Sequence, residues 1–137
     1  MATLTTAGVK ISVSTQFRQD FSALNEGVYF FNYRIDIQNS NEFDIQLLSR
    51  EWYIFDSLKE ASFVSGEGVI GEQPILKPGE KYTYTSGCEL SSDIGMMKGF
   101  YTFKKLNSDD LFQVFVPTFK LEYPATVSYT HLTLPTN

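Results

Sequence analysis

The chain has 137 residues, of which 42% are hydrophobic and 20% are charged, and its net charge at pH 7 is −5. This length fits one domain with a packed core, and the composition is that of a globular protein, which excludes a disordered chain. The acidic balance argues against a general surface for DNA, RNA or anionic membranes, since such surfaces need clustered Lys and Arg. No apolar run approaches a membrane span, and residues 1–6 lack the features of a signal peptide.

Period-two alternation of apolar and polar residues predicts most of the chain as strands. The longest alternation covers residues 29–38, with Tyr33 and Ile35 on its apolar face. In chain order, the predicted strands cover residues 9–14, 29–38, 43–55, 60–65, 81–86, 97–106, 111–116 and 119–121. Residues 17–26 are polar and predict a loop, and Pro117 is expected to end a strand.

Two details concern the way these strands are connected. The apolar phase of the third strand breaks at residues 48–50, which indicates a bulge or a crossover between sheets. Trp52, the only tryptophan, follows this break and is expected in the core. Gly87 and Gly95 are expected to bracket a further connection.

Seven to nine short strands without a convincing helix predict an all-β fold. The expected architecture is a Greek-key β-sandwich of the immunoglobulin or fibronectin type III kind, and a closed barrel is the alternative. We expect a single domain over residues 1–127. The uncharged residues 128–137 predict a disordered or non-native tail, with an extra edge strand as the alternative.

The segment richest in turn residues covers residues 66–80 and holds four of the nine glycines and two of the five prolines. Gly66, Gly68 and Gly71 spell G-x-G-x-x-G, a spacing that binds dinucleotides when a helix follows it. Two prolines come within the next eight residues and forbid that helix, so a Rossmann site is excluded.

A weaker anion site in this loop stays open. Successive glycine amides can form an anion-binding nest without a helix, and Lys77 or Arg50 would add a positive charge. Glu67 and Glu72 flank the motif and would repel phosphate. The competing interpretation is that these glycines only provide tight turns.

The residue content argues against an enzyme. The only histidine, His131, lies in the predicted tail, so no imidazole base is available to a nucleophile in the domain. The only cysteine, Cys88, cannot form an internal disulfide and predicts a packed thiol in a cytoplasmic protein. No carboxylate spacing singles out a catalytic pair, and we expect neither a metal nor a cofactor.

Aromatic residues make up 15% of the chain, more than two inner strand faces can bury. The candidates for outward-facing positions are Phe30, Tyr53, Phe55 and Phe100. An exposed aromatic patch marks a protein partner or self-association, so both a protein partner and a homodimer are expected alternatives. Packing of these rings under loops is the competing interpretation.

These stretches together resemble the ApaG family over roughly residues 8–124. The matching motifs are VYFFNYRI at 28–35, QLLSREWYI at 46–54, the glycine segment at 66–79, YTSG at 84–87, GMMKGFY at 95–101 and FVPTF at 115–119. The resemblance implies a fibronectin-type β-sandwich in a small cytoplasmic protein linked to cobalt resistance and magnesium efflux. It also implies a gene near that of a diadenosine tetraphosphatase, and eukaryotic relatives that carry the domain as an interaction module, as in F-box proteins.

The resemblance adds a ligand hypothesis at the glycine motif, where pyrophosphate or nucleotide binding has been suggested for the family. Glu51 departs from the family, which commonly has histidine there, so a metal or phosphate role at that position is in doubt. The leading hypothesis is a non-enzymatic protein-interaction or regulatory module. The alternative is a pyrophosphate or nucleotide sensor that uses Gly66–Gly71 with Arg50 or Lys77.

Overall fold

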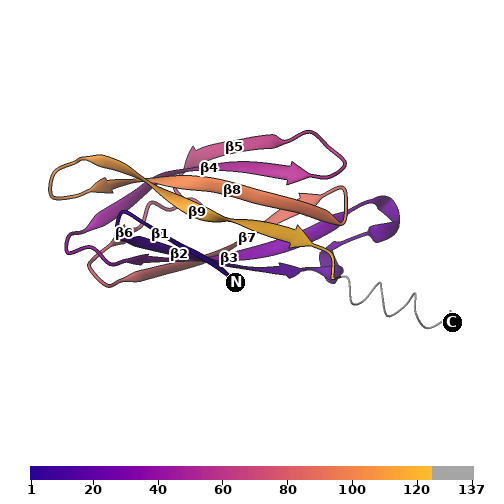
Figure 1. The fold of residues 1–137 in the computed structure, drawn as a ribbon, viewed down its shortest axis with the longest axis horizontal. Helices are drawn as coiled ribbons and strands as arrows, with labels where there is room; N and C mark the ends of the chain where they lie inside the picture. The colour runs from indigo at the N-terminus through magenta and orange to yellow at the C-terminus, as the bar shows by residue number, and fades with distance from the viewer. Residues whose placement is uncertain (125–137) are drawn as a thin grey trace.

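The computed structural model describes residues 1–124, and these residues form a two-layered β structure (Figure 1). The strands are β1 (Ala2–Thr6), β2 (Val9–Phe17), β3 (Tyr29–Asn39), β4 (Ile45–Asp56), β5 (Ser62–Glu67), β6 (Ile75–Leu76), β7 (Lys81–Leu90), β8 (Ile94–Lys105) and β9 (Leu111–Glu122). Two short 3-10 turns, η1 (Gln19–Phe21) and η2 (Leu24–Glu26), join β2 to β3. No helix in residues 1–124 is long and apolar enough to cross a membrane. The all-β prediction is confirmed, whereas the predicted tail at 128–137 and the domain end at 127 lie outside the described residues.

The strands divide into two antiparallel sheets that pack face to face as a β-sandwich. One sheet has the order β1-β2-β3-β7, and the other has the order β5-β4-β8-β9 with β6 also paired to β4. The chain changes sheet between β3 and β4, between β6 and β7, and between β7 and β8, which gives the expected Greek key. The closed-barrel alternative is wrong, because the strands form two separate sheets.

The core follows directly from the predicted alternation. Along β3 every second residue from Phe31 to Asn39 is buried, and most buried residues of β7, β8 and β9 also alternate. β4 buries Ile45 and Leu47 before its bulge and Trp52 after it. Trp52 is only 3% exposed and lies edge-on to the rings of Tyr33 and Phe119, at centroid distances of 5.7 and 5.9 Å. Burial of such side chains contributes roughly 1.5–3 kcal/mol each, so the inner faces hold the two sheets together.

Two strand boundaries differ from the sequence-based prediction. β1 is not predicted, because its residues are mostly exposed and show no buried alternation. Pro117 does not end a strand, since β9 continues through it to Glu122. The proline is tolerated because the β8–β9 register shifts between Met97 and Gly99, a bulge in which a missing N–H costs no ladder bond.

Other boundaries differ by smaller amounts. The predicted loop at 17–26 begins with the last residue of β2 and contains both 3-10 turns. Gly87 lies within β7 and Gly95 within β8, so the connection between them is much shorter than the two glycines suggest. The predicted break at 48–50 is confirmed as a bulge, because the β4–β8 register shifts between Leu47 and Ser49.

Candidate functional site

The outer surface of the β5-β4-β8-β9 sheet carries a row of aromatic side chains that we call the aromatic face. Its members are Tyr53, Phe55, Phe63, Phe100 and Phe115. Tyr53 and Phe55 alternate with the inward-facing Trp52, so the pleat of β4 directs them away from the core. Neighbouring rings contact edge-on, with 5.0 Å between the centroids of Tyr53 and Phe63 and 6.0 Å between Phe100 and Phe115.

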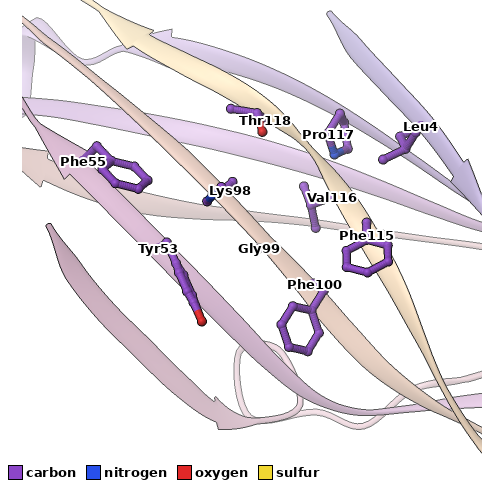
Figure 2. A pocket seen from close by; sticks show the side chains of 10 residues that line it. All are labelled: Leu4, Tyr53, Phe55, Lys98, Gly99, Phe100, Phe115, Val116, Pro117 and Thr118. Atoms are coloured by element: carbon purple, nitrogen blue, oxygen red, sulfur yellow. The ribbon is translucent and has the colours of Figure 1, made fainter.

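A shallow groove of about 650 Å³ crosses the aromatic face, as Figure 2 shows. Strands β4, β8 and β9 form its floor and walls, and Leu4 of β1 reaches it from the neighbouring sheet. Leu4 can do so because β1 lies beside β9, where the Phe115 N–H donates to Thr6 Oγ1 at 3.4 Å. The groove is therefore built from segments that are far apart in the sequence.

The floor of the groove is tied to the core. Gly99 of β8 lies directly over the inner layer, where a side chain would collide with the Glu51 carbonyl oxygen and the ring of Trp52. Only glycine lets β4 and β8 approach so closely at this point. The groove therefore has a well-packed base, and its shape is set by the backbone.

Lys98 is the only charged residue among those that line the groove. It stands opposite the β9 bulge at Pro117, and bulges re-aim the side chains beside them. Its Nζ lies 6.0 Å from the ring centroid of Tyr53 and 5.8 Å from that of Phe55. No salt bridge among residues 1–124 engages Lys98, so its charge is open to a bound carboxylate.

The predicted site at the glycine motif has a different character, because Arg50 already occupies it. Arg50 Nη1 donates to the carbonyl oxygens of Glu67 at 3.0 Å and Gly68 at 2.8 Å. Its guanidinium lies directly over Gly66, where a side chain would meet it at about 3.0 Å. The structure therefore brings Arg50, Gly66 and Gly68 together, but as a clamp within the loop.

The amides of this loop are also used internally. Gly68 N donates to Leu48 O at 2.7 Å, Val69 N to Glu72 O at 2.8 Å, and Glu72 N to Val69 O at 3.0 Å. Gly68 and Gly71 have φ angles of 60° and 74°, which explains glycine at both positions by turn geometry. An anion nest needs converging free N–H groups, and three of the candidate donors here are already committed.

Lys77 lies apart from the glycine motif, in the turn between β6 and β7. Its backbone N–H donates to Glu80 Oε1 at 2.7 Å, which closes that turn. No hydrogen bond between described residues joins it to residues 66–71. Glu72 of the loop accepts a hydrogen bond from Tyr82 Oη at 2.8 Å, so a carboxylate stands on the β7 side of the motif.

The described residues offer little for catalysis. Within residues 1–124, no group of three His, Cys, Asp or Glu side chains is placed to hold a metal ion. Burial raises the pKa of the Cys88 thiol to about 11, so it stays protonated and unreactive near neutral pH. Burial likewise raises the pKa of Tyr101, whose hydroxyl is hydrogen-bonded to Tyr84 inside the core.

Sequence reasoning found part of the aromatic face and missed the rest. Tyr53, Phe55 and Phe100 were expected to face outward and do so. Phe30 also faces outward, but on the other sheet, where its ring lies over Gly87. Phe63, Phe115 and Lys98 were not singled out. Their alternation with apolar inward-facing residues predicts that these side chains point outward. The sequence does not show, however, that three strands bring them side by side.

Known proteins resemble this chain over most of its length. A family model described as the ApaG domain matches residues 19–105. Protein ApaG of Methylorubrum extorquens (strain PA1) is 39% identical over 119 residues, 87% of this chain and 91% of that protein. Protein ApaG of Mesorhizobium japonicum is 39% identical over 121 residues, 88% of this chain and 92% of that protein. The crystal structure of the Bordetella pertussis ApaA protein is similar with a TM-score of 0.81 and 36% identity, covering 85% of this chain and 94% of that one.

Proposed function

The chain belongs to the ApaG family, and from this premise we propose that it is a non-enzymatic interaction domain that binds a protein partner through the aromatic face. The observation that carries the proposal is the exposed groove with a single lysine among its aromatic side chains. Soluble domains rarely expose a contiguous apolar surface without a use for it, and aromatic residues are enriched at protein interfaces.

The groove also indicates the chemistry of the partner. The whole chain carries a net charge of −5, yet Lys98 is the only charge in the groove lining. A shallow groove over a sheet suits an extended segment, whose alternate side chains reach the floor. The proposed partner is therefore an extended peptide segment with apolar or aromatic side chains and an Asp or Glu that pairs with Lys98.

Phage-displayed random peptides test this specificity directly. Selection on the folded protein is expected to enrich peptides that combine aromatic or aliphatic residues with at least one carboxylate. Lys98→Glu should weaken binding of the selected peptides at least tenfold, a change of about 1.4 kcal/mol. Lys81→Glu is the matched control, because it makes the same charge change on β7, away from the groove, and should bind like the parent.

Two results would contradict the proposal. One is a selection that enriches no peptides of this kind on a folded sample. The other is binding that survives Lys98→Glu as well as it survives Lys81→Glu, since the groove would then not be the site.

We propose that the protein acts in the cytoplasm, and that the expected link to cobalt resistance and magnesium efflux is indirect and arises through the bound protein partner.

The competing hypothesis is a pyrophosphate or nucleotide sensor at Gly66–Gly71 with Arg50 or Lys77. It is disfavoured because Arg50 and three loop amides are engaged within the loop. A thermal-shift titration with pyrophosphate, ATP and diadenosine tetraphosphate, with and without Mg²⁺ or Co²⁺, separates the two. We expect no shift, whereas a shift of several degrees that Gly68→Val removes would favour the sensor.

A further inference from the structure

We propose that a second copy of the chain pairs with the exposed edge of β5, so that two domains join through one continuous sheet. The inference goes beyond the peptide-binding function, because it assigns a role to the backbone edge of β5, beside the aromatic face, and a different partner. It depends on the hydrogen-bonding phase of β5 and on the exposure of two apolar side chains.

β5 is the end strand of its sheet, and its backbone phase follows from the bond at its end. Gly68 N donates to Leu48 O, which lies opposite it when the β4–β5 register is continued by one residue beyond Ser49 and Glu67. Bonded pairs alternate along an antiparallel ladder, so Ser62, Val64 and Gly66 bond to β4. Phe63 and Ser65 then direct their N–H and C=O groups outward, away from the sheet.

One further contact agrees with this phase. The carbonyl oxygen of Glu67, another odd-numbered position, accepts a hydrogen bond from the Arg50 side chain and not from the β4 backbone. The free edge of β5 therefore presents two adjacent donor–acceptor pairs, at Phe63 and Ser65.

The central part of this edge, residues 62–65, lacks the features with which proteins normally block strand addition. Such features include prolines, charged side chains, bulges and covering segments. The β5 sequence SFVSGE contains neither proline nor lysine, and its pairing with β4 runs without a register shift. Its charged residue, Glu67, lies at the end of the strand, where the Arg50 side chain occupies the outward carbonyl oxygen. By contrast, β9 at the opposite end of the sheet has Pro117 at a bulge and lies against β1.

Two large apolar side chains of β5 are exposed on opposite faces of the strand. Phe63 is 54% exposed on the outer face, and Val64 is 40% exposed on the inner face. Side chains on both faces of an end strand remain exposed when no further strand pairs with it. Both side chains would lose exposed apolar surface if another strand were added.

A second copy fits this edge in a self-complementary register. With the two-fold axis at Val64, Phe63 faces Ser65 of the second copy, and their outward groups form four backbone hydrogen bonds. The two Val64 side chains then face each other at a close, non-bonded position about 4.5 Å apart between Cα atoms. Glu67 faces Ala61, so no like charges stand directly opposite.

Two contacts in this register favour a second copy as the partner. The exposed Val64 meets an apolar side chain of its own kind, and the two Phe63 rings come into diagonal contact. The pairing joins the two aromatic faces into one surface. A six-residue edge buries less area than a standard interface, so the dimer is weak and dissociates on dilution.

Analytical ultracentrifugation of the purified protein between about 10 µM and about 1 mM tests the dimer. Ser65→Pro removes an outward N–H without breaking the β4–β5 ladder, and Ser65→Ala is the matched control. The parent and the alanine variant should self-associate, and the proline variant should do so at least tenfold more weakly. A parent that stays monomeric at about 1 mM, or a folded proline variant that associates like the parent, would overturn the inference.

Oxidative cross-linking tests the register. Val64→Cys places two thiols opposite each other at the axis, within disulfide reach, and should form a disulfide-linked dimer rapidly. Ser62→Cys is the matched control, because it lies on the same strand face but opposite Gly66 of the second copy. The native thiol of Cys88 is buried and should not interfere. Equal cross-linking of the two variants would overturn the register.

The dimer and the proposed peptide site can fail independently. Peptide binding is measured on the Ser65→Pro variant, whose groove and Lys98 are untouched. We expect the Ser65→Pro variant to lose the dimer and to keep its affinity for the selected peptides. This result would support the groove as the peptide site and the β5 edge as the dimer site.

Discussion

The two sheets have outer faces that differ in aromatic content, although both are built from antiparallel strands with the same alternation. The outward positions of β2, β3 and β7 are mainly polar and include Ser12, Ser14, Gln16, Asn32, Arg34, Asp36, Thr83 and Thr85. The corresponding positions of β4, β5, β8 and β9 include the aromatic face around Lys98, with polar residues such as Glu51, Thr102 and Gln113 beside it. An antiparallel sheet normally presents a polar face to water, so the aromatic face is the departure from the rule.

This difference separates the surfaces that form the core of the sandwich from the outer surfaces that the core does not use. Both inner faces are buried and supply the apolar contacts that hold the sandwich together. The aromatic face adds exposed apolar surface that the sandwich does not need for its core. Under the proposed function, this surface is the one that binds the partner.

The largest effect is expected where the two sheets meet. Trp52→Ala should lower the free energy of unfolding by about 3–5 kcal/mol, because it removes the ring that packs against Tyr33 and Phe119. Chemical denaturation followed by circular dichroism measures the change. A change near zero would contradict the core role of Trp52 and move it to the binding surface.

The next effect concerns the turn at which the chain passes from the polar-faced sheet to the aromatic-faced sheet. Asp56, at the end of β4, accepts hydrogen bonds from Ser91 N at 2.6 Å, Ser92 Oγ at 2.7 Å and Leu58 N at 3.1 Å. Burial alone would raise the pKa of Asp56, but these bonds outweigh it and hold the pKa below its ordinary value. Asp56→Ala should therefore cost about 1–3 kcal/mol of unfolding free energy.

The same carboxylate predicts a pH dependence. Because its pKa is lower in the folded state, its stabilisation is complete above the unfolded pKa of about 3.9 and is lost as pH falls through the folded value. Denaturation midpoints measured between about pH 6 and pH 2 should fall on acidification, and less steeply in Asp56→Ala. Parallel profiles for the two proteins would show that Asp56 does not contribute.

The smallest effects on stability are expected for substitutions on the two outer faces, which should differ in their effect on peptide binding. Arg34→Ser on the polar face should change the unfolding free energy by about 0.5 kcal/mol or less, and Phe115→Ser on the aromatic face should lower it by about 1 kcal/mol through its lost contact with Phe100. Only Phe115→Ser should weaken binding of the selected peptides, by at least tenfold in fluorescence titrations. Equal loss of binding in both variants would remove the functional distinction between the faces.

The fold was largely predictable because alternation is a local property that depends on burying one face of each strand. Residues 29–38 and the bulge near Leu48 were readable for this reason. β1 escaped prediction because its exposed residues carry no apolar period, and the strand depends on its long-range contacts with β2 and β9. Pro117 was misjudged because local chemistry cannot show that a proline falls in a bulge.

The candidate sites depended far more on the tertiary structure. The glycine motif predicts an anion site from spacing alone, but Arg50 and the loop amides have partners that only the folded chain supplies. The groove needs Leu4 of β1 beside strands that follow it by at least forty residues, and the free edge of β5 depends on the position of β4. The residue order thus determined which side chains face inward, whereas the long-range packing decided which groups were left without partners, because hydrogen-bond satisfaction and exposure are set by neighbours distant in sequence.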